Sequence, residues 1–308
     1  MAEYRPLRRR FDRLLFYPLQ AAAAFLVLGF FALLPVAVAS ALGGLLGRTV
    51  GPLLPVTARA RRNMERALPE LSAAERAAAI AEMWDNLGRV LGEYTHIETI
   101  TRDAGRGGRV EVTGTEHIAA IQEPGAPRLL FSGHFANWEV FALTLRAAGV
   151  PYVQIYRAPN NPFIDALIRR VRRLAESDIV PKGASGARKA IAVLRAGRRL
   201  GMLVDQKMND GISVPFFSMP AMTAPALAQL ALRFHCPVFP VRMERLGGCR
   251  FRVSFHPPLP VADTGDRRAD VAATMTAVNA MLERWIRERP GQWLWLHRRW
   301  PDDAVPGA

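Results

Sequence analysis

Short apolar segments typical of β-strands alternate with longer segments of helical periodicity between residues 109 and 288. This alternation predicts an α/β fold, in which a mostly parallel sheet is flanked by helices. The connection Gly247-Gly248 predicts that the last two strands form an antiparallel hairpin at the edge of the sheet. The predicted strands are 109–113, 128–132, 152–156, 200–205, 237–242 and 250–255, and the predicted helices are 138–148, 162–177, 185–197, 224–235 and 268–288.

No charged residue occurs between Arg13 and Arg48, and this apolar stretch is long enough to cross a bilayer. No signal-peptide cleavage site accompanies it, so we expect an N-terminal membrane anchor helix that the protein retains. Arginines flank the stretch on both sides, so the distribution of positive charge selects no orientation. Pro35 allows either one kinked span or a pair of helices that re-enters the membrane. We therefore predict a basic arm and hydrophobic anchor over residues 1–50 and one catalytic domain over residues 51–308.

The chain carries a net charge of +14, mostly from arginine, and such a field attracts polyanions. Anionic lipids, acidic proteins and nucleic acids are the candidate partners. No nucleic-acid-binding module is recognisable, which makes a membrane-tethered nucleic-acid binder the least favoured of the hypotheses. The two cysteines lack metal-binding spacing and indicate a reducing, cytoplasmic setting.

The segment 129–139 carries the strongest functional signal. Its apolar run ends in Ser-Gly and is followed at once by His134, while Asn137 is placed to cap a helix. Glu139 then falls in the first helical turn, from which its carboxylate can reach back toward the imidazole. A histidine that a carboxylate orients and charge-balances has the least that a general base requires. The alternative is a loop histidine next to a glutamate that only stabilises the helix dipole.

Three further polar residues follow predicted strands. Arg157 comes directly after the third strand, and Asp205 and Gln206 lie at the end of the fourth. In a doubly wound sheet the loops at the carboxyl ends of strands gather at one crevice, so all three could face His134. An arginine there binds a phosphate, stabilises an oxyanion or braces its loop with an ion pair. The aspartate either orients a partner side chain or caps its loop.

Several segments allow a structural as well as a functional interpretation. A capping box at Ser72 and Glu75 begins another helix. Residues 215–223 are expected to form a flexible apolar loop that contacts an acyl chain or completes the core. Residues 292–300 combine three tryptophans with two arginines, which suits a bilayer interface, a domain-closing helix or stacking on single-stranded nucleic acid. The helix after Ser72 places these apolar residues at core spacing: Ile80, Met83, Trp84, Leu87, Val90 and Leu91.

Residues 133–139, Gly-His-Phe-Ala-Asn-Trp-Glu, resemble the HxxxxD/E site of glycerolipid-type acyltransferases. The glutamate form resembles the branch of that superfamily that makes the late acylations of lipid A in Gram-negative bacteria. One departure is Ser218, which stands where this branch typically has glycine after the phenylalanine pair. Further matches extend over nearly the whole chain, at 63–70, 156–157, 205–206, 215–217 and 292–300.

The resemblance implies a chemistry. His134 would take the proton of an acceptor hydroxyl, which then attacks an acyl thioester, and Glu139 would orient the imidazole and stabilise the imidazolium. Arg157, Asp205 and Gln206 are the residues that the resemblance places at the substrate, with Arg157 stabilising an oxyanion or holding a phosphate and Asp205 supporting the site from behind. The resemblance implies no metal and no free cofactor.

The resemblance also implies the partners and the location. The acyl donor is expected to be an acyl carrier protein, and the acceptor a phosphorylated glycolipid, the precursor of lipid A. The catalytic domain is expected on the cytoplasmic face of the inner membrane. The alternative is an acyl-CoA-dependent acyltransferase that acts on a lysophospholipid or another glycolipid.

Overall fold

Seven strands form the central sheet of the computed structural model, which describes residues 15–156, 158–171, 178–181 and 183–301. All neighbouring strands run parallel except β8 and β9. The α/β fold with a mostly parallel sheet is therefore confirmed. In spatial order the strands are β1 (Val110–Thr113), β9 (Arg250–Phe255), β8 (Val238–Gly247), β2 (Arg128–Ser132), β5 (Arg199–Leu203), β3 (Val153–Tyr156) and β4 (Ile179–Pro181).

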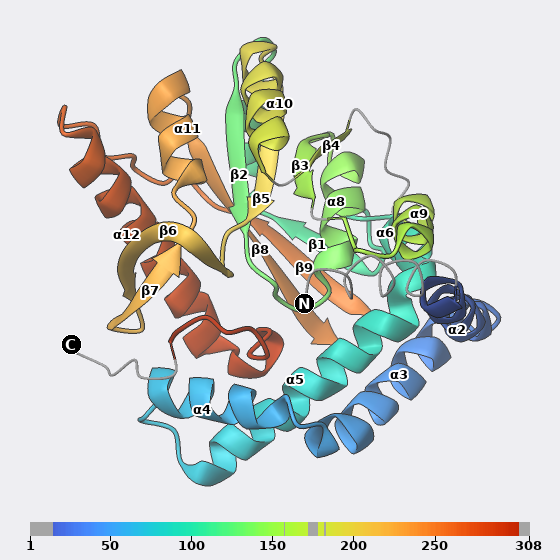
Figure 1. The fold of residues 1–308 in the computed structure, drawn as a ribbon. Coiled ribbons are helices and arrows are strands. Elements are labelled where there is room, and N and C mark those ends of the chain that lie inside the picture. The colour runs from blue at the N-terminus through green and yellow to red at the C-terminus, as the bar shows by residue number, and fades with distance from the viewer. Residues whose placement is uncertain (1–14, 157, 172–177, 182, 302–308) are drawn as a thin grey trace, which may run out of the picture.

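Helices cover both faces of this sheet (Figure 1). Side chains alternate across a strand, so Leu129 and Phe131 of β2 enter one hydrophobic core while Leu130 enters the other. The first core includes residues of α4 (Thr57–Ala67), α5 (Ala73–Glu93), α10 (Ala184–Arg195), α11 (Ala226–Phe234) and α12 (Arg267–Glu288). The second includes residues of α6 (Ile97–Thr101), α7 (Ile118–Gln122) and α8 (Trp138–Ala147).

The apolar N-terminal stretch forms two helices, α2 (Tyr17–Ala32) and α3 (Val36–Val50), with Pro35 at the break. Helix α3 lies along α5 so closely that a Cβ atom on Gly43 would sit 2.3 Å from the carbonyl oxygen of Gly88. The predicted domain boundary at residue 50 thus separates two helices that pack directly against each other. Helix α2 and its C-cap residue instead leave large apolar side chains exposed, among them Leu26 at 76% and the C-cap Leu33 at 86%.

By length and composition, Val36–Leu53 is the one helix among the described residues that could cross a membrane, although 33% of it is buried inside the protein. The membrane topology stays a prediction. Helix α9 (Pro162–Val171) lies beside α2, and the amide of Asn161 donates to the carbonyl oxygen of Tyr17 at 2.9 Å. Residues 172–177, the end of the predicted helix 162–177, fall outside the described residues.

The expectation of a flexible loop at residues 215–223 is wrong. These residues belong to an antiparallel pair, β6 (Lys207–Phe216) and β7 (Met219–Thr223), which forms a second sheet. Its turn places Phe217 and Ser218 at φ angles of +52° and +56°, a conformation that glycine adopts without strain. Pro215 and Pro220 face each other across the pair, and a two-stranded sheet tolerates them because both strands are edges. Because proline is rare inside strands, a segment with two prolines is not predicted as a strand.

The expected hairpin is present, but it does not lie at the edge of the sheet. Strands β8 and β9 pair antiparallel, with the turn at Gly248 and Cys249, one residue later than predicted, yet β1 pairs in parallel with β9 and takes the edge position. The contact between β1 and β9 joins residues far apart in the chain, which local patterning does not encode.

The C-terminal segment completes the first hydrophobic core. Trp293, Trp295 and Trp300 are exposed by only 1%, 0% and 3%, and each ring nitrogen donates a hydrogen bond within the protein. The interpretations of this segment as a bilayer interface or a nucleic-acid platform are therefore wrong. The segment closes the domain, but as turns and extended chain after the short helix η6 (Pro290–Gln292), not as a helix.

Helix α5 largely follows its prediction. The capping box at Ser72 and Glu75 is present, and four of the six predicted core residues are buried. Leu91, by contrast, is 45% exposed. Just beyond α5, Nε2 of His96 lies 2.9 Å from the carbonyl oxygen of Phe31.

Candidate active site

The candidate site lies where two neighbouring strands end. Strands β2 and β5 run parallel with Ser132 opposite Leu203, and His134 and Asp205 follow two residues beyond that pair. Equal spacing on neighbouring parallel strands brings both side chains to the same edge of the sheet. The structure thus brings together residues that are 71 positions apart in the chain.

The carboxylate of Asp205 is almost fully buried, at 2% exposure, and accepts three hydrogen bonds. Nδ1 of His134 lies 2.8 Å from Oδ1, while Oδ2 accepts from the backbone N–H of His134 at 2.9 Å and from Nε1 of Trp293 at 2.8 Å. Burial alone would raise the pKa of Asp205, but the charge of His134 and these hydrogen bonds outweigh it and lower the pKa to about 2. Asp205 is therefore ionised at neutral pH.

An ionised carboxylate only accepts hydrogen bonds, so the neutral imidazole of His134 carries its proton on Nδ1. Nε2 then holds a lone pair, and the amide nitrogen of Gln206 lies 3.3 Å from it. Trp138 packs against the ring edge-to-face, with 5.3 Å between ring centroids. The side chain of His134 remains 17% exposed, so a substrate hydroxyl can approach Nε2.

Glu139 begins α8, where its backbone N–H donates to Oδ1 of Asn137 at 3.1 Å. Asn137 thus caps the helix as predicted. Glu139 is 8% exposed, and the carboxylate 2.8 Å from Nδ1 of His134 is that of Asp205 on the neighbouring strand. A role of Glu139 in catalysis stays a prediction.

The remaining predicted site residue, Arg157, falls outside the described residues. Strand β3 ends immediately before it. Within the part of the chain that the structure describes, no group of three histidine, cysteine or acidic side chains is arranged to hold a metal ion.

The loop between β2 and α8 is held in a tight conformation. A Cβ atom on Gly133 would lie 2.6 Å from the ring of Phe135, and Ala136 has a φ angle of +47°. The backbone N–H of Ala136 donates to the carbonyl oxygen of Gln292 at 2.8 Å, and Phe135 forms a β-bridge with Trp293. The segment whose Trp293 binds Asp205 therefore also fixes the loop Gly133–Asn137, called the histidine loop below.

Sequence reasoning missed this part of the site. Trp293 stood out only as part of a tryptophan-rich tail, and nothing in that pattern indicates that its ring nitrogen binds Asp205. Trp138 was visible next to Glu139, yet helical spacing does not show that it packs against His134.

An imidazole that is hydrogen-bonded to a buried carboxylate, at the carboxyl edge of an α/β sheet, can act as a general base. The model of the family described as bacterial lipid A biosynthesis acyltransferases matches residues 9–302. The chain therefore belongs to this family, and the protein is an acyltransferase.

Individual relatives agree with this assignment. The chain is 29% identical over 245 residues to a lipid A biosynthesis lauroyltransferase of Escherichia coli, which covers 77% of this chain and 76% of the relative. It is 27% identical over 281 residues to a lipid A biosynthesis palmitoleoyltransferase of the same organism, with 88% of each chain covered. It is also similar, at 26% identity over 259 residues, to a lipid A biosynthesis acyltransferase of Haemophilus influenzae, with coverage of 80% and 79%.

Proposed function

We propose that the protein transfers a fatty acyl chain from the thioester of an acyl carrier protein to a hydroxyl of a lipid A precursor, as a late acylation at the cytoplasmic face of the inner membrane. The observation that carries the proposal is the 2.8 Å contact between Nδ1 of His134 and the buried carboxylate of Asp205. This contact leaves Nε2 unprotonated, beside the amide of Gln206 and on a ring that is partly exposed, which suits a general base for a hydroxyl.

In the proposed reaction His134 acts first as a base and then as an acid. Nε2 of His134 takes the proton of the acceptor hydroxyl while the hydroxyl oxygen attacks the thioester carbonyl, which forms the new C–O bond. When the tetrahedral intermediate collapses, the C–S bond breaks, and the imidazolium returns the proton to the leaving thiolate. Asp205 stabilises the imidazolium because it is ionised and lies 2.8 Å from the ring.

Gln206 takes part by its position beside Nε2. Its amide nitrogen occupies the side of the imidazole that the acceptor hydroxyl must reach, so the hydroxyl replaces Gln206 at Nε2 when it binds. The freed amide can then donate to a substrate oxygen. Arg157 and Glu139 keep their predicted roles, which are the binding of an oxyanion or phosphate and the support of the imidazole.

Charge and surface support the choice of substrates. The net charge of +14 favours both an acidic carrier protein and a phosphorylated glycolipid. The exposed apolar side chains of α2 suit contact with the membrane that holds a lipid acceptor.

The test compares His134→Ala with the control His235→Ala, which removes a histidine that is 79% exposed and remote from Asp205. Full-length variants in membranes receive acyl carrier protein or CoA thioesters and a lipid A precursor, and mass spectrometry reports the acylated product. His134→Ala should lower kcat by a factor of about 10²–10⁴ while the control stays at the wild-type value. Wild-type activity in folded His134→Ala would refute the general base. Transfer from CoA to a lysophospholipid alone would favour the alternative substrates.

A further inference from the structure

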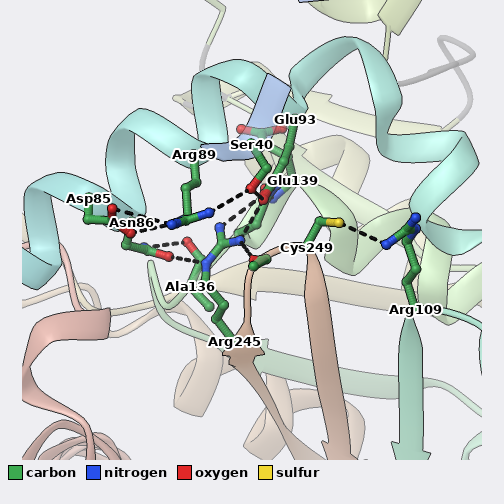
Figure 2. A network of polar contacts seen from close by, with 12 residues as sticks. Ser40, Asp85, Asn86, Arg89, Glu93, Arg109, Ala136, Glu139, Arg245 and Cys249 are labelled. Carbon is green, nitrogen blue, oxygen red and sulfur yellow. Dashed lines mark hydrogen bonds and ion pairs between the residues drawn. The ribbon is translucent and has the colours of Figure 1, made fainter. Parts of the chain in front are cut away.

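A second buried ion pair lies beneath the loop that carries His134. Glu93, the last residue of α5, is fully buried and faces Arg245 of β8, which is 8% exposed. Nη1 and Nη2 of Arg245 donate to the two carboxylate oxygens of Glu93 at 2.5 Å and 3.0 Å (Figure 2). Such a two-pronged contact fixes both side chains in one geometry.

The pair is joined to the histidine loop at two points. The amide nitrogen of Asn137 donates to Oε2 of Glu93 at 2.7 Å. Nε of Arg245 donates at 2.7 Å to Asn86, whose own amide donates to the carbonyl oxygen of Ala136 at 2.9 Å. Ala136 is the residue with the positive φ angle, so the network contacts the loop where its backbone is most restricted.

The contact with Glu93 also decides which way the Asn137 amide points. With its nitrogen on Glu93, Asn137 presents its oxygen to the backbone N–H of Glu139 and caps α8. A reversed amide would lose both contacts. The carboxylate of Glu93 therefore sets the start of α8 and, through Ala136, the loop that presents His134.

We infer that Glu93 and Arg245 are positioning residues of the acyltransferase centre, which hold the Gly133–Asn137 loop so that His134 meets Asp205 and the acyl acceptor in productive geometry. The inference rests on the proposed function, because it assigns the pair a role in the site built around His134. It also extends that site to α3, since the hydroxyl of Ser40 donates to Glu93 at 2.6 Å.

The experiment exchanges donor and acceptor in the hydrogen bond between Asn137 and Glu93. Both carboxylate oxygens of Glu93 accept from Arg245, so Glu93→Gln places its amide nitrogen against an Arg245 donor in either orientation, and against the Asn137 amide nitrogen in one of them. Asn137→Asp places a carboxylate against Glu93. Each single variant therefore loses contacts of the network. The double variant restores the hydrogen bond between the two side chains with donor and acceptor exchanged, because the glutamine donates to the aspartate, which still caps α8 and returns a negative charge near Arg245. Arg89→Met is the control, since Arg89 lies on the same helix and contacts Ser40 and Asp85 but not the loop.

Two readouts are taken on the full-length, detergent-solubilised protein. Each single variant should lower kcat about 100-fold, with KM for the acyl donor changed far less, because a small misplacement of a reacting group is costly. Amide hydrogen exchange in the peptide over residues 133–141 should become about tenfold faster, while strands β2 and β5 stay protected. The double variant should recover most of both losses, and Arg89→Met should change neither.

Glu93→Gln with wild-type kcat and wild-type exchange would overturn the inference, as would a folded double variant that is no better than the worse single one. If Glu93→Gln fails to fold, Asn137→Ser decides the matter, because serine keeps the cap of α8 and removes only the bond to Glu93. If the wild-type protein transfers no acyl chain to any lipid A precursor, the proposed function fails, and the exchange data still test whether the pair holds the loop.

Discussion

Two buried carboxylates lie on either side of the histidine loop, and their partners differ. Asp205 is bound to an imidazole that can gain or lose a proton and is partly exposed, whereas Glu93 is bound to a guanidinium that stays charged and is buried. A carboxylate paired with a titratable, accessible ring can take part in proton transfer. A carboxylate paired with a permanent cation can only hold structure. The molecule thus separates the chemistry of the site from its support.

The largest expected effect on activity is that of Asp205→Asn. Oδ2 of Asp205 accepts two hydrogen bonds, so the single oxygen of asparagine should take that position and turn its amide nitrogen toward Nδ1 of His134. The imidazole must then carry its proton on Nε2, which removes the base. We expect kcat to fall by a factor of about 10²–10⁴.

The control for this variant is Asp210→Asn, because Asp210 is an exposed residue of β6. Steady-state kinetics on both variants should separate them by at least two orders of magnitude. An Asp205→Asn protein with nearly full activity would remove the difference between the two carboxylates.

Arg245→Met should act on stability rather than on protonation. It leaves Glu93 buried without its cation, which costs about 3–5 kcal/mol in the free energy of unfolding. Arg252→Met is the matched control, because Arg252 pairs with Glu111 at the surface with both side chains about 40% exposed, and such pairs contribute about 0–1 kcal/mol. Denaturant unfolding measures both values, and equal losses would contradict the contrast between buried and exposed pairs.

The pH dependence of the free energy of unfolding should show how much the charge of Asp205 stabilises the fold. Its pKa is about 2 in the folded protein and ordinarily 3.8, so the folded state binds protons less readily than the unfolded state. The stabilisation is complete above pH 3.8 and disappears as the pH falls through about 2. The shift corresponds to roughly 2 kcal/mol.

Unfolding of the wild-type protein and Asp205→Asn should therefore be compared from neutral pH downward. Their difference in free energy of unfolding should be constant at neutral pH and shrink below about pH 4. A difference that does not change with pH would show that Asp205 gains nothing from its charge.

Removing one neutral hydrogen-bond donor from Asp205 should lower kcat less than Asp205→Asn does. Trp293→Phe deletes the hydrogen bond to Oδ2 and should lower kcat about tenfold, the size expected for one hydrogen bond to a charged group. Trp295→Phe is the matched control, since its ring nitrogen donates to the carbonyl oxygen of Pro290 and not to the site. Both variants should lose similar stability, so equal activities would show that Trp293 serves packing alone.

The smallest effect is expected when Glu93 loses only its hydrogen bond from Ser40. Ser40→Ala removes one of its donors, but the contacts of Glu93 with Arg245 and Asn137 remain. We expect a loss of about 1 kcal/mol in the free energy of unfolding and a kcat close to the wild-type value. Calorimetry and kinetics on Ser40→Ala check both, and a large loss of kcat would show that α3 acts on the site more directly.

Local sequence determined the elements around the histidine. Strand β2 has its predicted bounds, Asn137 caps α8, and the capping box at Ser72 begins α5. Such features depend on neighbouring residues, because periodicity and capping act over one or two turns of chain. The sequence also placed His134, Asp205 and Gln206 at one edge of the sheet, since parallel strands end together.

Only the tertiary structure decided which groups touch. The contact between His134 and Asp205 depends on the register of β2 and β5. The pair of Glu93 and Arg245 joins residues 152 positions apart. Hydrogen bonds and ion pairs act over a few ångströms in space without regard to distance along the chain, so residue types and spacing alone do not reveal them.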